Sequence, residues 1–125
     1  MELNEYQERA MRTCMPSSEN FSYMMLNLVG ELGEFASKIA KGIRKDELDI
    51  EANRLCQYHE DGYPIHIQDG IFKDNLKYEA GDILWQLAGL CQTFGWTLEE
   101  VAQANLDKLA SRQQRGVING EGDNR

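Results

Sequence analysis

The sequence lacks several common catalytic devices. It has only two histidines, and no arrangement of Ser, His and Asp or of Cys and His that indicates an activated nucleophile. It also has no Gly-rich phosphate-binding loop of the Walker type. Cys56-x-x-His59 together with His66 suggests zinc, but a fourth ligand has no clear candidate. Functions that depend on these devices are therefore disfavoured.

Positive charge and long apolar runs are scarce as well. Thirteen Lys and Arg residues stand against 21 Asp and Glu, and the net charge of −8 argues against binding to a nucleic-acid backbone or an anionic membrane. No apolar run approaches the roughly 20 residues that span a bilayer, and Met1 leads straight into Glu2 without a signal peptide. The three cysteines, Cys14, Cys56 and Cys91, are widely spaced and odd in number, as reduced thiols would be. We expect a cytoplasmic protein with no nucleic-acid or membrane partner.

Apolar periodicity is strong over most of the chain, whose 125 residues are most simply one domain, 1–125. Apolar side chains recur at intervals of three and four and predict four helices, over about residues 3–15, 19–44, 73–94 and 97–114. Ser17-Ser18 is the expected N-cap of the second helix, and Thr97 with Glu100 forms a capping box for the fourth. The predicted fold is all-α, with the main helices packed as a four-helix bundle.

The stretch from Lys45 to about Phe72 loses this periodicity. A short helix over about 46–58 is compatible with it, followed by turns at 61–64 and 69–70 with a brief extended piece, 65–67, between them. We expect an irregular excursion between the second and third helices, with a hairpin or a lid as an alternative. The last ten residues, 116–125, contain three glycines and predict an irregular tail.

Two acidic pairs are the most informative pattern. Glu31-Leu-Gly-Glu34 and Glu79-Ala-Gly-Asp82 each place two carboxylates three residues apart, on one face of a predicted helix. Set opposite one another, they would surround a point with four negative charges, which is tolerable only with cations among them. Oxygen ligands in that number suit a hard divalent ion such as Mg²⁺.

A helical wheel supports the metal-site interpretation and leaves one alternative open. Both pairs flank the apolar stripe of their helix at the same offset, with the second carboxylate about 60° further from the core than the first. Gly33 and Gly81 each cost about 1 kcal/mol in a helix interior, which suggests close approach of backbone, metal or ligand. Ordinary solvated charges remain the alternative. A di-iron site is disfavoured because the third position of each motif is never His.

The fourth predicted helix carries a row of polar and basic residues. Asn105, Lys108, Arg112 and Arg115 occupy an arc of about 80° that borders the apolar stripe. Such a cluster beside a metal site is what a polyphosphate would need. The alternative is a helix C-terminus enriched in cations that complement its dipole.

The chain resembles the MazG-like nucleoside triphosphate pyrophosphohydrolases of the all-α NTP pyrophosphatase superfamily. The paired acidic motif carries the likeness, and other segments extend it over most of the chain: Tyr6-Gln7, Thr13, Gly81-Asp82-Ile83-Leu84-Trp85, Asn105-Leu-Asp-Lys108-Leu-Ala-Ser-Arg112 and the ending from Arg115 to Arg125. The segment of about 45–72 departs from the family, because compact members have a shorter connection there.

The resemblance implies a site and a reaction. Glu31, Glu34, Glu79 and Asp82 would bind Mg²⁺, with Mn²⁺ as a substitute, and Glu34 would hold or deprotonate the attacking water. Asn105, Lys108 and Arg112, with Arg115, Asp123 and Arg125 as weaker candidates, would contact the phosphates or sugar. The implied reaction converts a nucleoside triphosphate (NTP) and water into a monophosphate and pyrophosphate. The family also implies a homodimer or homotetramer.

Two alternatives stay open at this point. The substrate can be another pyrophosphate-linked nucleotide, such as an alarmone or phosphoribosyl-ATP. The chain can also be a non-catalytic nucleotide-binding module, although such a module has no need for all four carboxylates.

Overall fold

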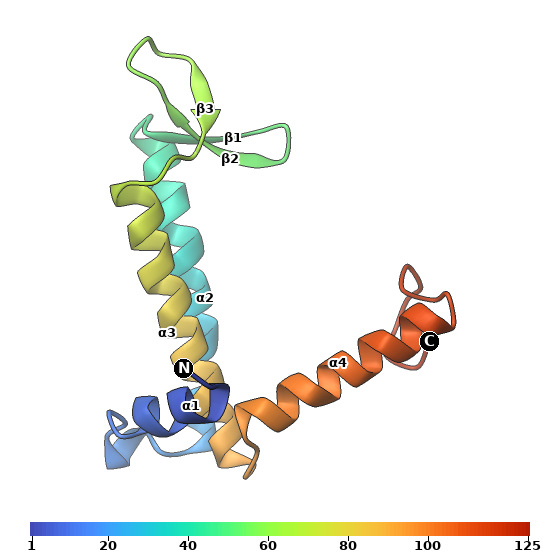
Figure 1. Cartoon of the computed structure of the whole chain (residues 1–125). Helices are drawn as coiled ribbons and strands as arrows, with labels where there is room; N and C mark the ends of the chain where they lie inside the picture. Colours follow the sequence, from blue (N-terminus) through green and yellow to red (C-terminus); the bar gives the residue numbers. More distant parts are fainter.

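The computed structural model describes all residues, 1–125, as four α-helices and a small three-stranded sheet. The elements are α1 (Leu3–Met11), a 3-10 turn (Pro16–Ser18), α2 (Phe21–Arg44), β1 (Leu48–Glu51), β2 (Arg54–Tyr58), β3 (Pro64–His66), α3 (Ile71–Thr93) and α4 (Leu98–Gln114). The long helices α2 and α3 lie side by side and run in opposite directions, with the sheet joining their upper ends (Figure 1). None of the helices is long and apolar enough to cross a membrane.

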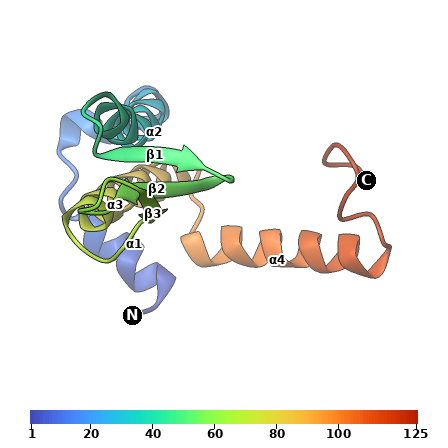
Figure 2. The ribbon, with the colours of Figure 1, turned by 90° about the horizontal axis from the view of Figure 1, so that it is seen from above.

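Only the first turn of the fourth helix packs on the others. The helix leaves the lower end of the α2–α3 pair and projects to one side, as both ribbon views make clear (Figures 1 and 2). The helical content is as expected from the sequence, but the four-helix bundle is not formed within this chain. The sequence pattern gave α4 an apolar stripe and could not say which surface would cover it.

The helix ends follow the local chemistry closely. The Thr97 hydroxyl accepts a hydrogen bond from the Glu100 amide and the Glu100 carboxylate accepts one from the Thr97 amide, both at 3.1 Å, so the capping box is confirmed. For α2 the predicted cap is wrong. Ser17 and Ser18 lie in the 3-10 turn, and the side chain of Asn20 accepts from the amide of Tyr23 at 2.8 Å. The first helix ends at Met11, four residues earlier than expected.

The excursion between α2 and α3 is an antiparallel sheet in the order β1–β2–β3, and the helix predicted over 46–58 is wrong. Ala52 and Asn53 both have positive φ, 50° and 62°, and form the two-residue turn between β1 and β2. That turn type favours Asn-Gly or Asp-Gly, so Ala-Asn gave no clear signal. The extended piece before α3 is confirmed as β3, and Gly62, with φ 86°, lies in the turn before it.

Two glycines permit close packing, and they are not the two that the sequence suggested. A Cβ at Gly42 would overlap the side chain of Leu48, and a Cβ at Gly89 would overlap Met24. At Gly33 and Gly81 no atom lies within 4 Å of a built Cβ. The close approach expected at those two positions is therefore not made by this chain.

The hydrophobic core lies at the lower end, where α1 crosses α2 and α3. It is small: its buried members are Met11, Met24, Ala88, Cys91 and Leu98. Gln7 joins the elements there, donating to the carbonyls of Ala88 and Trp96 and accepting from the Leu98 amide. Only 13 of 125 residues are buried, so much apolar surface on the long helices faces outward.

Candidate metal centre and substrate site

Three of the four predicted carboxylates converge between α2 and α3. Glu31 projects from α2 toward Glu79 and Asp82, which lie one turn apart on α3, and one oxygen of each lies within 4.8 Å of the others. Glu31 and Glu79 are half-buried and Asp82 is exposed. The antiparallel helix pair therefore brings the two acidic motifs together, as their matched offsets from the core predict.

The cluster carries a strong excess of negative charge. Burial raises the pKa of the Glu31 carboxyl, and the charges of Glu34, Asp82 and Glu79 raise it further, while a hydrogen bond from Asn27 lowers it. One buried oxygen of Glu31 and one of Glu79 have no hydrogen-bond partner. A buried carboxylate oxygen left unpaired is costly. Unpaired carboxylate oxygens in such a cluster fit a divalent cation, whose preferred ligands are of this kind.

A polar chain behind the cluster, which the sequence reasoning missed, orients Glu31. The Asn27 amide donates to Glu31 Oε1 at 3.3 Å and to Gln86 Oε1 at 2.7 Å. Gln86 is 2% exposed and donates to the Met24 carbonyl at 3.4 Å. A Gln within the apolar stripe of α3 was the available signal, because a buried amide needs partners. These hydrogen bonds hold the Asn27 amide where it can position the Glu31 carboxylate.

Glu34 lies beside this cluster rather than in it. It is exposed and is not one of the three carboxylates whose oxygens converge. It is close enough that its charge is the largest electrostatic contribution to the raised pKa of Glu31. It also lines a small hollow together with Glu79. The structure therefore places the predicted catalytic carboxylate at the open edge of the candidate metal centre.

Lys38 is a neighbour of the site that sequence reasoning did not single out. Its Nζ lies 3.2 Å from Glu79 Oε1, so the ammonium of α2 reaches across to the carboxylate of α3. Lys38 follows Glu34 by one turn of α2, and this i, i+4 relation was the signal that could have found it.

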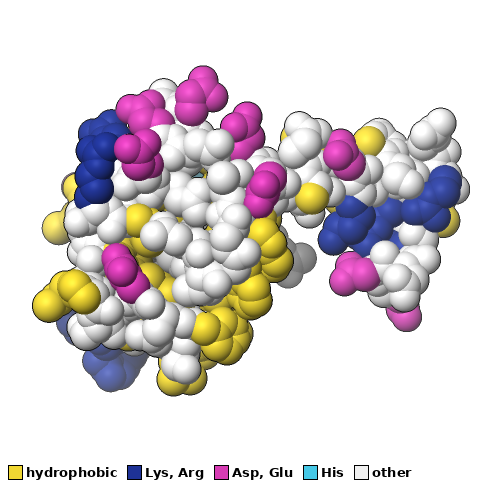
Figure 3. Space-filling view, turned by 90° about the horizontal axis from the view of Figure 1, so that it is seen from below, with side chains coloured by type: hydrophobic (Ala, Val, Ile, Leu, Met, Phe, Trp, Pro, Cys, Tyr) yellow, Lys and Arg dark blue, Asp and Glu magenta, His cyan; other side chains and the backbone are white.

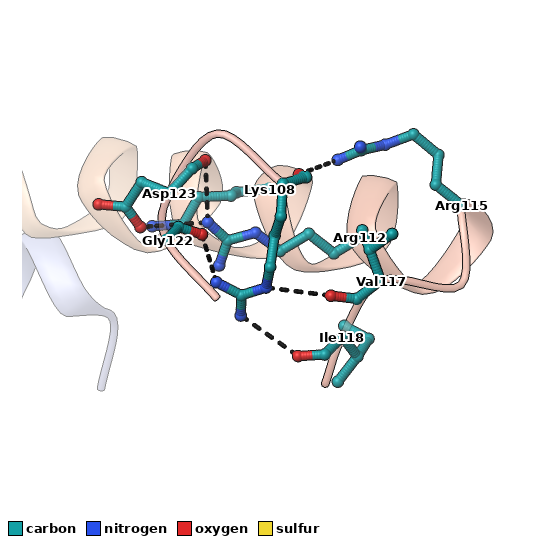
Figure 4. A network of polar contacts seen from close by, with 8 residues as sticks. Lys108, Arg112, Arg115, Val117, Ile118, Gly122 and Asp123 are labelled. Atoms are coloured by element: carbon teal, nitrogen blue, oxygen red, sulfur yellow. Dashed lines mark hydrogen bonds and ion pairs between the residues drawn. The ribbon is translucent and has the colours of Figure 1, made fainter. Parts of the chain in front are cut away.

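The predicted substrate-binding residues of α4 are not brought to the carboxylates. Lys108 and Arg112 instead contact Asp123 of the tail, whose Oδ1 lies 3.6 and 3.1 Å from their nitrogens (Figure 4). Arg115 donates to the Ser111 hydroxyl and to the Arg125 carbonyl. Asn105 is exposed on the same helix. Lys and Arg side chains gather over the far part of α4, well away from the body of the molecule (Figure 3).

The tail, expected to be irregular, is turned back onto the end of α4. The Arg125 guanidinium donates to the carbonyls of Val117 at 3.0 Å and Ile118 at 3.2 Å, and to that of Gly122 (Figure 4). Arg112 is 5% exposed and its Nε has no partner. The cations of α4 are therefore held in a fixed arrangement by the residues that follow them.

The zinc interpretation gains no support. Cys56 is buried in β2 with its thiol toward the Arg54 carbonyl, and His59 stacks on Tyr63. The carboxylates of α2 and α3 form the one group of three metal-ligating side chains in the structure.

An antiparallel helix pair with converging carboxylates defines a helical protein with a candidate carboxylate metal centre. The chain belongs to the family described as the MazG nucleotide pyrophosphohydrolase domain, whose model matches residues 19–117. It is also 40% identical over 110 residues to the "Gene 37 protein" of Mycobacterium phage L5, an alignment that covers 87% of this chain and 80% of that protein. No solved structure matches significantly. The chain is thus a pyrophosphohydrolase of the MazG family, a family that generally uses divalent metal.

Proposed function

We propose that the protein is a Mg²⁺-dependent enzyme that hydrolyses (deoxy)nucleoside triphosphates to the monophosphate and pyrophosphate. The observation that carries the proposal is the convergence of Glu31, Glu79 and Asp82, with two buried oxygens unpaired, in a chain of the MazG family. Those carboxylates would hold Mg²⁺, with Mn²⁺ as a substitute. Glu34, which lies beside them, would be the fourth carboxylate ligand. When bound, the ion supplies positive charge that neutralises the phosphates and acidifies bound water.

The proposed role of Glu34 follows from its exposed position beside the cluster. Its carboxylate accepts a proton from the attacking water as the water oxygen bonds to the α-phosphorus. The bond from that phosphorus to the α–β bridging oxygen breaks, and its electron pair leaves with the pyrophosphate. The products are a nucleoside monophosphate and pyrophosphate, and atoms and charge balance without another reactant.

The active form is proposed to be a homodimer or homotetramer. In this chain α4 lies apart from α2 and α3, so Asn105, Lys108, Arg112 and Arg115 reach a carboxylate cluster only in an assembly. Exposed apolar side chains support a second copy: Leu26 (74% exposed), Val29 (59%) and Leu32 (52%) on α2, and Leu106 (58%) and Leu109 (41%) on α4. If the apolar side of α4 in one copy covered the apolar side of α2 in another, the helices of the two copies would complete a four-helix bundle.

The test is incubation with a panel of nucleotides and Mg²⁺, following monophosphate and pyrophosphate separately. The panel includes the common ribo- and deoxynucleoside triphosphates, an alarmone and phosphoribosyl-ATP. Release of pyrophosphate from triphosphates, abolished by a chelator, is the expected result. Cleavage of the alarmone or phosphoribosyl-ATP alone would contradict the substrate class. Binding of a nucleotide without any cleavage would contradict the enzyme assignment.

Glu34→Gln tests the two proposed roles of Glu34, as a metal ligand and as the base. We expect turnover to fall about 10²-fold or more and Mn²⁺ affinity, measured by calorimetry, to fall as well. Glu60→Gln is the matched control, because Glu60 is exposed near the turn before β3 and should leave both quantities unchanged. Near-normal turnover of Glu34→Gln would remove this residue from the mechanism.

A further inference from the structure

A single stripe along α2 changes its charge from negative to positive. Its members follow one another at intervals of three and four residues: Glu31, Glu34, Lys38, Lys41 and Lys45. Side chains at such intervals share one side of a helix. Three lysines therefore continue the line of the carboxylates toward the sheet, in a chain whose net charge is −8.

Two adjoining hollows accompany these lysines. The one nearer the carboxylates has a volume of about 170 Å³ and is lined by Glu34, Ser37, Lys38, Lys41 and Glu79, with no hydrophobic residue among them. The second, of about 160 Å³, lies between the end of α2 and the start of α3. Lys38 and Lys41 line both hollows, so the two form one groove. Together they reach the lower end of the range for small-ligand pockets, about 300 Å³.

The second hollow differs from the first in its composition. Lys45, Glu47 and Asn75 add polar groups, whereas Leu48, Phe72 and Leu76 contribute apolar surface. Leu48 can enter because Gly42 has no side chain, so the first strand of the sheet forms this wall. The sheet therefore bounds the groove at the end away from the carboxylates.

Three lysines and three carboxylates, Glu34, Glu47 and Glu79, line the groove, but two of the lysines have no carboxylate partner. Lys38 is paired with Glu79 at 3.2 Å and is still 44% exposed. No carboxylate oxygen lies within 4.0 Å of the Lys41 or Lys45 ammonium. By contrast, Lys108 and Arg112 of α4 share Asp123. Lys38 and Lys41 are therefore the cations that line the hollow beside the carboxylates Glu34 and Glu79.

We propose that Lys38 and Lys41, with Lys45 behind them, bind the β- and γ-phosphates of the substrate, the part that departs as pyrophosphate. The inference rests on the proposed function for the identity of the anion, and it adds phosphate-binding residues from the same chain as the carboxylates. The α-phosphorus then lies toward Glu34 and the converged oxygens, and the leaving group lies over the lysines. Cations there stabilise the charge that develops on the departing pyrophosphate.

The test measures inorganic pyrophosphate binding by calorimetry, with Mg²⁺ present and no turnover. Lys41→Gln and Lys38→Gln should each weaken binding about tenfold, the size of a lost charge-assisted hydrogen bond. Lys77→Gln is the matched control, because it removes the same charge from an exposed lysine of α3 that lines neither hollow. The KM for the triphosphate should rise in the two groove variants, and Mn²⁺ affinity should be unchanged in Lys41→Gln.

The outcomes separate this proposal from the one on which it rests. If no triphosphate is cleaved but pyrophosphate binding still depends on Lys41, the groove stands and the proposed reaction fails. If triphosphates are cleaved and Lys41→Gln and Lys38→Gln bind pyrophosphate like the unaltered protein, the groove is overturned. If Lys77→Gln lost as much pyrophosphate affinity as the groove variants, the loss would come from net charge alone, and the proposed groove would be overturned as well.

Discussion

The antiparallel pair α2–α3 and the projecting helix α4 differ in what covers their apolar surfaces and in the charges they carry. Both have apolar stripes and charged borders, yet α2 and α3 cover each other, while α4 packs on its own chain only at its first turn. The pair gathers carboxylates that have few cations among them, and α4 gathers cations that its own tail neutralises. The division suggests that the two halves of one site are built separately and are joined only when chains assemble.

The largest expected effect comes from breaking the carboxylate cluster on the α2–α3 side. Asp82→Asn removes one of the three converging charges while keeping the shape of the side chain. We expect turnover to fall about 10²-fold or more and Mn²⁺ affinity, measured by calorimetry, to fall with it. Glu60→Gln again serves as the control. Normal turnover with normal metal affinity would place the metal elsewhere.

Next in size is the effect of blocking the surface of α4. Leu106→Asp puts a charge on an apolar side chain that is 58% exposed in the single chain. If a second copy covers it, burying an unpaired charge is prohibitive and the assembly dissociates. Sedimentation velocity should then report a smaller species. Gln113→Asp adds the same charge on an exposed polar position and should leave the assembly intact. An unchanged sedimentation coefficient for Leu106→Asp would refute an interface there.

A smaller effect is expected from the polar chain behind the metal centre. Gln86→Leu keeps the volume but leaves the Asn27 amide and the Met24 carbonyl without this partner. Unsatisfied buried groups cost roughly 1–3 kcal/mol each, so urea denaturation should show a loss of unfolding free energy of that order. Gln113→Leu, on an exposed position, should change stability little. A variant as stable as the unaltered protein would mean that the hydrogen bonds of Gln86 and Asn27 orient Glu31 without stabilising the fold.

The smallest effect concerns the tail of α4. A hydrogen bond from Arg112, with the charges of Lys108 and Arg112, lowers the pKa of the Asp123 carboxyl. A lowered folded-state pKa means that the tail contact is present above the ordinary carboxyl pKa and is lost as pH falls through the lowered value. Amide exchange over 117–123 should therefore quicken in acid, and Asp123→Asn should show the same fast exchange at neutral pH. Equal exchange in the variant and the unaltered protein would mean that Asp123 does not hold the tail.

Features encoded within a few residues were predictable, and features set by distant contacts were not. The Thr97–Glu100 cap is local, and it was predicted correctly. The meeting of Glu31 with Glu79 and Asp82 followed from two helices that share one core. The hairpin was offered only as an alternative, and the three-stranded sheet was not predicted, because the turn uses Ala52-Asn53 in place of glycine.

The same distinction between local and distant contacts explains which features of the candidate site were predicted and which were missed. Lys38 was missed because its importance comes from α3, which places Glu79 across from it. The expected approach of α4 to the carboxylates failed for a physical reason, since nothing in an amphipathic pattern says whether the covering surface belongs to the same chain. The segment 45–72, where the sequence loses its helical periodicity, is also where the structure has strands that bound a groove.

Attack at the α-phosphorus is tested most directly by hydrolysis of a nucleoside triphosphate in ¹⁸O-labelled water with Mg²⁺, followed by mass spectrometry of the products. Attack at the α-phosphorus beside Glu34 predicts that one ¹⁸O enters the nucleoside monophosphate and none enters the pyrophosphate. Label in pyrophosphate, or release of orthophosphate as the labelled product, would place the attack on another phosphorus and contradict the account.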